Sequence, residues 1–125
     1  MLLADKPLGL QLLAEFWGCN REKINDPKKV EQLMLDAVKE AGAEAVGSIF
    51  HEFEPQGISG VVVISASHLA IHTWPELGYA AVDIFICGVH MDPWRALKRL
   101  EVQFEVRKIQ VTEVPRGIPS ADPDL

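Results

Sequence analysis

The sequence predicts an α+β fold, a two-layer α/β sandwich in which an antiparallel sheet of about six strands carries two helices on one face. Two segments repeat their apolar residues at the helical spacing, and each follows an Asp-Pro pair. Six other segments are short and rich in β-branched or aromatic residues, as strands are. Two helices cannot cover both faces of such a sheet, so we expect the second face to need a partner, most economically a second protomer.

The first strand is predicted over residues 8–17 and ends at Gly18. The first helix begins after Asp26, which suits the N-cap, with Pro27 at a position where its fixed φ is already helical. Gly42 ends this helix. Its apolar residues recur at helical spacing, and they are Val30, Leu33, Met34, Ala37, Val38 and Ala41.

Four strands follow the first helix, and hairpins are the simplest way to connect them. In the first of the four, Ile49, His51 and Phe53 share one parity and therefore one face. The predicted ranges are residues 45–53, 58–65, 67–74 and 78–87.

A second Asp-Pro pair, at residues 92–93, opens the second helix. A last strand is predicted over residues 106–114, and the final residues 116–125 are expected to form a loose tail because they are rich in Pro, Gly, Ser and Asp. The buried stripe of the second helix is predicted to consist of Trp94, Leu97, Leu100 and Phe104.

The chain has 125 residues, the usual size of one globular domain, and residues 1–125 are expected to form a single domain. Its formal net charge of −6 argues against a nucleic-acid partner, since such binding depends on clustered Lys and Arg. The longest apolar run is too short to cross a bilayer, and a signal-peptide pattern is lacking, so we expect a soluble cytoplasmic protein without a membrane partner. Two cysteines, Cys19 and Cys87, are too few for a disulfide framework, and free thiols are expected.

Residues 57–88 hold most of the reactive side chains, including His68 and His72. On a helix this spacing would bring two imidazoles to one metal ion, but on a strand it separates their Cα atoms by about 13 Å. We therefore expect no metal site.

The same stretch closely resembles the bacterial and archaeal S-adenosylmethionine decarboxylase proenzymes. The resemblance rests on a long run of unusual residues and covers the general layout of nearly the whole chain. The matching segments are SHLAIHTWPE at 67–76, GYAAVD at 78–83, FICG at 85–88, FHEFEP at 50–55, GISGVV at 57–62 and DPW at 92–94.

The resemblance implies a self-processing enzyme whose pyruvoyl cofactor is made from its own backbone. By this analogy the Ser67 hydroxyl attacks the carbonyl of Ala66, the resulting ester eliminates, and the second piece begins with a pyruvoyl group. That group forms a Schiff base with S-adenosylmethionine and accepts the electrons left by the departing CO₂. The product would be the aminopropyl donor of spermidine biosynthesis.

The resemblance also assigns roles to individual residues. Ser59 and His72 would assist the processing at Ser67, and Cys87 would donate the proton that follows decarboxylation. Glu76 would accept a hydrogen bond from the substrate ribose. Two aromatic residues, Phe53 and Trp74, either pack within the protein or stack on the adenine and the sulfonium cation.

Strand geometry adds a prediction that is independent of the resemblance. If residues 67–74 form one regular strand, Ser67 and His72 lie about 16 Å apart on opposite faces. A hairpin centred between residues 65 and 66 would place Ser59 directly opposite His72. A chemistry that uses both Ser67 and His72 should therefore take them from two copies, so we expect a homodimer with shared active sites.

Two positions depart from the family pattern. Ala66 replaces an acidic residue before the processed serine, and Ile86 replaces a threonine before the cysteine. Three hypotheses therefore stay open: an S-adenosylmethionine decarboxylase, a related pyruvoyl decarboxylase acting on ornithine or arginine, and an uncut, non-catalytic partner subunit.

Overall fold

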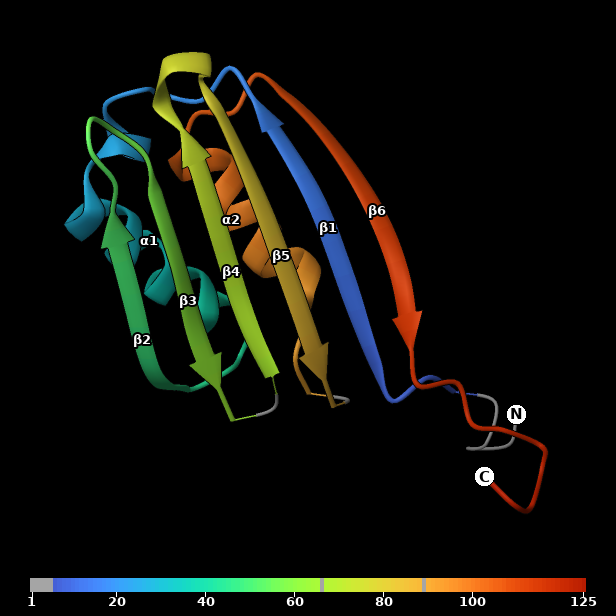
Figure 1. Ribbon diagram of the computed structural model, residues 1–125. Helices are drawn as coiled ribbons and strands as arrows, with labels where there is room; N and C mark the ends of the chain where they lie inside the picture. The colour runs from blue at the N-terminus through green and yellow to red at the C-terminus, as the bar shows by residue number, and fades with distance from the viewer. Residues whose placement is uncertain (1–5, 66, 89) are drawn as a thin grey trace.

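A single antiparallel sheet with strand order β2-β3-β4-β5-β1-β6 forms one layer of the protein (Figure 1). The structure is a computed structural model that describes residues 6–65, 67–88 and 90–125. Its strands are β1 (Gly9–Trp17), β2 (Ala45–Glu52), β3 (Ile58–Ile64), β4 (Ser67–Trp74), β5 (Tyr79–Cys87) and β6 (Lys108–Arg116). Its helices are α1 (Pro27–Glu40) and α2 (Pro93–Gln103), with short 3₁₀ turns η2 (Lys23–Asn25) and η3 (Pro75–Leu77).

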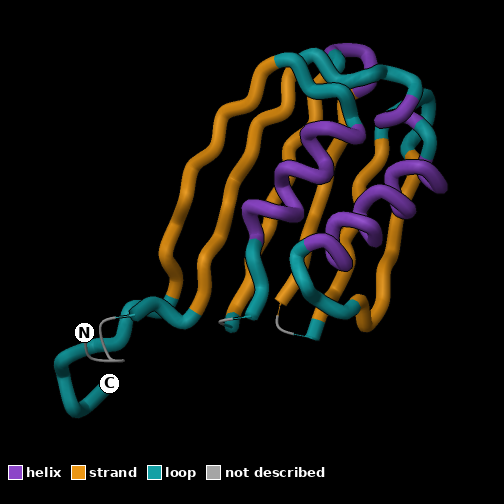
Figure 2. Tube along the Cα trace, turned by 180° about the vertical axis from the view of Figure 1, so that it is seen from behind, coloured by secondary structure: helices purple, strands orange, loops and turns teal. Residues whose placement is uncertain are grey.

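Both helices lie on the same face of the sheet (Figure 2). α1 packs on β2 and β3, α2 packs on β5 and β1, and the two helices pack on each other. The core between the layers includes Leu12, Phe16, Met34, Leu69, Ile71, Ile84, Leu100 and Phe104, all fully buried. The predicted two-layer α+β architecture is confirmed. No described helix is long and apolar enough to cross a membrane.

The Asp-Pro pairs open the helices as predicted. The Asp26 side chain accepts hydrogen bonds from the backbone N–H groups of Lys28 and Lys29, and Asp92 accepts one from Trp94. The prediction that Trp94 belongs to the buried stripe of α2 is wrong, because 43% of its surface is exposed. The buried residues of α2 are Pro93, Ala96, Leu97 and Leu100, and Trp94 lies to one side of the face that they define.

The last strand begins and ends two residues later than predicted. Glu105 adopts a positive φ of 56° after α2, and the N–H of Val106 donates to the carbonyl of Glu101, so the chain is still leaving the helix there. At the other end, Arg116 still pairs with Gly9. Residues 117–125 contain no helix or strand.

The face of the sheet that points away from α1 and α2, here named the open face, is covered by no described element. It carries several large apolar side chains that are substantially exposed, among them Ile49 at 71% and Val63 at 47%. Exposed apolar area of this kind is typical of an interaction surface. The sheet register places Ser59, His72 and Cys87 on this face, and it places Ser67 on the face that carries the buried residues Leu69 and Ile71.

Candidate active site

Ser59 and His72 lie directly opposite each other on β3 and β4. Their Oγ and Nδ1 atoms are 2.8 Å apart, which is hydrogen-bonding distance. This pairing confirms the predicted hairpin register. The imidazole is exposed and the serine half-buried, so the pair is accessible from the open face.

A pocket of about 350 Å³ lies beside this pair. Five of the predicted site residues line it, namely Phe53, Ser59, His72, Trp74 and Glu76. A second, mostly apolar pocket of about 290 Å³ also reaches Ser59 and His72 from the side of β2. The structure therefore brings the predicted substrate-binding and processing residues together at one end of the sheet.

An aromatic row that sequence reasoning did not identify extends behind this pocket. Trp17, Tyr79 and Trp74 are neighbours on β1, β5 and β4, with ring centroids 4.3 Å apart for Trp17 and Tyr79 and 5.2 Å for Trp74 and Tyr79. The Tyr79 hydroxyl donates a hydrogen bond to Glu15. Burial, with added contributions from Glu15 and Asp83, raises the pKa of Tyr79 to about 12. The phenol therefore stays protonated at neutral pH.

The backbone of the turn that carries Glu76 is anchored to the chain segment that follows β1. The Arg21 guanidinium donates a 3.0 Å hydrogen bond to the carbonyl of Glu76. Gly78 takes the left-handed conformation that ends the turn, and its carbonyl accepts from the N–H of Cys19. Burial raises the pKa of the Cys19 thiol to about 11, which leaves this cysteine an inert packing group.

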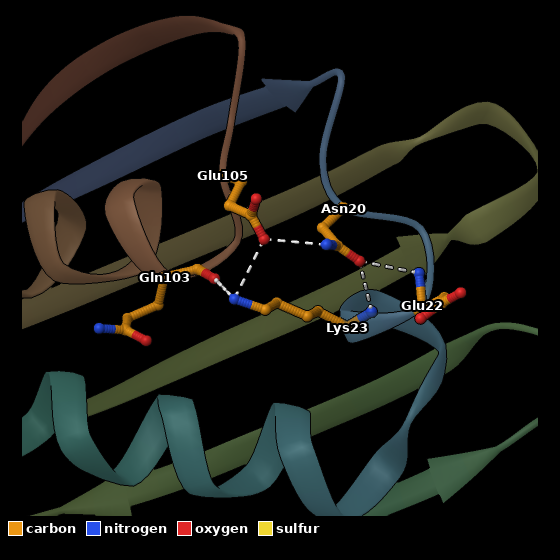
Figure 3. Close-up of polar contacts among 5 residues, drawn as sticks. All are labelled: Asn20, Glu22, Lys23, Gln103 and Glu105. Carbon is orange, nitrogen blue, oxygen red and sulfur yellow. Dashed lines mark hydrogen bonds and ion pairs between the residues drawn. The ribbon is translucent and has the colours of Figure 1, made fainter.

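A polar network in turn fixes the segment that carries Arg21 (Figure 3). Lys23 donates to the carbonyl of Gln103, at the end of α2, and lies 3.1 Å from the Glu105 carboxylate. Asn20 donates to Glu105 at 2.8 Å and accepts from the N–H groups of Glu22 and Lys23. The hydrogen bonds from Lys23 and Asn20 lower the pKa of Glu105.

Ser67 lies at the opposite end of β4. It begins this strand opposite Ile64 and Ile86, and its φ of 153° falls in a region that residues other than glycine rarely adopt. Ala66, the other residue of the predicted cleavage site, lies outside the described residues. The residue on the C-terminal side of the bond that would be cut is therefore strained.

Cys87 ends β5 at the same end of the sheet and is half-buried. The side chains of Cys87 and Phe85 occupy the space above Gly9, where an added Cβ would meet them at 2.8 and 2.7 Å. Arg116 lies over the Phe85 ring at 5.2 Å and donates a hydrogen bond to Gln11.

The predicted residues therefore form two groups at opposite ends of β4. Ser67 and Cys87 lie where β4 starts, and the pocket with Ser59, His72 and Glu76 lies where it ends. The five residue steps of extended chain from Ser67 to His72 span about 16 Å. One chain does not bring the two groups together.

The fold and these two groups define a small two-layer α+β protein with candidate enzyme residues at both ends of β4. Residues 10–117 match the family model described as S-adenosylmethionine decarboxylase. The chain belongs to this family, whose activity is that of a carboxy-lyase.

Named relatives and a solved structure agree with this membership. The chain is 56% identical over 113 residues to the S-adenosylmethionine decarboxylase proenzyme of Moorella thermoacetica, covering 90% of each chain. It is 55% identical to the protein of the same name from Pelotomaculum thermopropionicum, with the same coverage. The crystal structure of the adenosylmethionine decarboxylase from Aquifex aeolicus superposes with a TM-score of 0.85 at 37% identity, over 94% of this chain and 97% of that chain.

Proposed function

We propose that this protein is a proenzyme that cuts itself between Ala66 and Ser67 and then decarboxylates S-adenosylmethionine. The observation that carries the proposal is the strained backbone of Ser67 at the start of β4. Such conformations cost about 1–3 kcal/mol and cluster at functional sites. Attack of the Ser67 hydroxyl on the preceding carbonyl breaks the strained linkage, so part of this strain favours the cut.

The surroundings of Ser67 suit a ketone formed from its own backbone. The residue is half-buried, held between two strands, and close in register to the Cys87 thiol through its partner Ile86. When formed, the pyruvoyl group would supply an electron sink for the electron pair that stays on the substrate carbon as CO₂ departs. Cys87 then serves as the acid that returns a proton to the substrate carbon.

The pocket at the other end of β4 is proposed to hold the nucleoside part of the substrate. Its volume of about 350 Å³ lies within the usual range for small-molecule sites. Glu76 accepts a hydrogen bond from the ribose, and the rings of Phe53 and Trp74 contact the adenine and the sulfonium. Ser59 and His72 hold and move the protons of the cleavage reaction.

A complete site requires two copies of the chain. Two sheets that meet through their open faces about a two-fold axis would set the start of β4 in one copy against the end of β4 in the other. The exposed apolar side chains of this face, including Ile49 and Val63, support such an association. In this homodimer, Ser67 and Cys87 of one protomer act with Ser59, His72 and Glu76 of its partner.

Family membership favours S-adenosylmethionine over ornithine or arginine, and a proenzyme over an uncut partner subunit. Intact-mass measurement and CO₂ release test both choices. We expect two fragments divided before Ser67, and release from S-adenosylmethionine but from neither amino acid. A chain that stays whole after long incubation would contradict self-cleavage, and faster release from ornithine or arginine would contradict the substrate.

A mixing experiment tests the shared site. Ser67→Ala and His72→Ala chains are each expected to be inactive alone. Co-expressed in equal amounts, half of the dimers are mixed, and each mixed dimer holds one intact site out of two, so about a quarter of the wild-type activity returns. No recovery despite dimer formation would show that both residues act within one chain.

A further inference from the structure

Trp74 is the point where the aromatic row meets the pocket. One side of this residue lines the pocket with His72 and Glu76, and the other side faces Tyr79. Its surface is 40% exposed, so surrounding packing leaves the ring partly free to change its angle. What holds this ring therefore influences the shape of the pocket.

Tyr79 is the residue best placed to hold it. The Tyr79 ring is confined on one side by Trp17, to which it stacks at an angle of 26°, and on the other by Trp74. Its hydroxyl donates to the Glu15 carboxylate, two residues before Trp17 on β1. A ring held by contacts on both sides and at its tip has little freedom to rotate. The protonated phenol keeps its hydrogen bond throughout the neutral pH range, because its pKa is about 12.

We propose that Tyr79 is a positioning residue that sets the ring of Trp74 for substrate binding, and that Glu15 acts through it. This inference rests on the proposed function, in which Trp74 contacts the substrate. Tyr79 and Glu15 do not line the pocket, and the reacting groups at Ser67 and Cys87 lie at the other end of β4. The pair therefore affects KM and leaves the chemical step and self-cleavage unchanged.

Three variants separate this role from a structural one. Tyr79→Phe keeps the ring and removes the hydrogen bond to Glu15, and we expect KM for S-adenosylmethionine to rise about three- to tenfold with kcat within about twofold of wild type. Glu15→Ala should have the same effect. Glu15→Gln should keep the wild-type KM, because the amide oxygen of glutamine still accepts the hydrogen bond from the Tyr79 hydroxyl. Trp94→Phe changes an exposed aromatic residue of the helix layer and serves as the matched control with unchanged KM.

Near-UV circular dichroism provides a readout that does not depend on turnover. The stacked rings contribute to this signal, so Glu15→Ala, which keeps all three rings, should alter it, and Glu15→Gln should not. Failure of the wild-type protein to release CO₂ from S-adenosylmethionine would refute the proposed function, while the dichroism would still decide whether Glu15 orders the aromatic row. An unchanged KM in Tyr79→Phe, an unchanged dichroism in Glu15→Ala, or a Glu15→Gln variant as impaired as Glu15→Ala, would overturn the inference.

Discussion

Replacing Gly9 with alanine is expected to slow turnover by displacing Cys87. The new Cβ would lie 2.8 Å from the Cys87 sulfur and 2.7 Å from the Phe85 ring. Ordinary contacts between such atoms are about 3.5–4.0 Å, so both side chains must retreat by about 1 Å. The carbonyl of Ile86, at 3.2 Å, must give by a smaller amount.

The structure sets the size of the expected effect. Overpacking of this kind lowers the free energy of unfolding by about 1–3 kcal/mol. Alanine also reduces the entropy of the unfolded chain, which offsets about 0.4–1 kcal/mol of this loss. The net loss of about 1–2 kcal/mol corresponds to a fall in Tm of about 3–10 °C for a domain of this size. A displacement of about 1 Å at a reacting group slows catalysis by up to about a hundredfold, so we expect kcat to fall about ten- to a hundredfold.

The assay compares Gly9→Ala with Gly47→Ala, because an added Cβ at Gly47 meets nothing within 4 Å. CO₂ release gives kcat, thermal unfolding at one fixed protein concentration gives Tm, and intact mass gives the extent of cleavage. Gly47→Ala should match wild type in all three. If Gly9→Ala also kept wild-type kcat and Tm, the crowding at Cys87, and with it the placement of the proposed proton donor, would be refuted.

Three further predictions concern single side chains. Cys87→Ala should still be cut before Ser67, because Cys87 is proposed to act after cleavage, but its kcat should fall by at least about a hundredfold; normal turnover would remove Cys87 as the acid. Asp26→Ala loses the cap of α1, which accepts two N–H groups, and should lower Tm by about 3–5 °C in a thermal melt, corresponding to about 1 kcal/mol; an unchanged Tm would contradict the capping role. The pKa of Glu105 is lowered from 4.5, so its contribution to stability is present above that pH and is lost as the pH falls through the folded value. Denaturant titrations should therefore show a weaker acid dependence in Glu105→Gln than in wild type, and a difference that persists unchanged in high salt would argue against an exposed ion pair.

Local patterns in the sequence predicted much of the fold. The Asp-Pro pairs located both helix starts because an N-cap acceptor and a proline act within a few residues of each other. The register of β3 and β4 follows from the centre of their hairpin, which places Ser59 opposite His72. Such features depend only on residues close in the chain.

The features that sequence reasoning missed depend on distant pairings. The contact between Tyr79 and Glu15, and the support of Glu76 by Arg21, arise only because β1 inserts beside β5. Periodicity carries no information about that neighbour. Trp94 was mispredicted for a related reason. Its spacing from Leu97 fits a buried stripe, but its exposure depends on where the axis of α2 lies on the sheet.

The position of β1 has a mechanical consequence for a chain cut before Ser67. The N-terminal piece would own β1, β2 and β3, and the C-terminal piece would own β4, β5 and β6, yet β1 lies between β5 and β6. Strands of the two pieces therefore alternate within one sheet, and their helices also pack on each other. Separating them would require breaking three strand pairings at once, those of β3 with β4, β5 with β1 and β1 with β6, so the two pieces would stay held together after a cut before Ser67. The new chain end at Ser67 would therefore keep its place at the start of β4, which the proposed catalytic group requires.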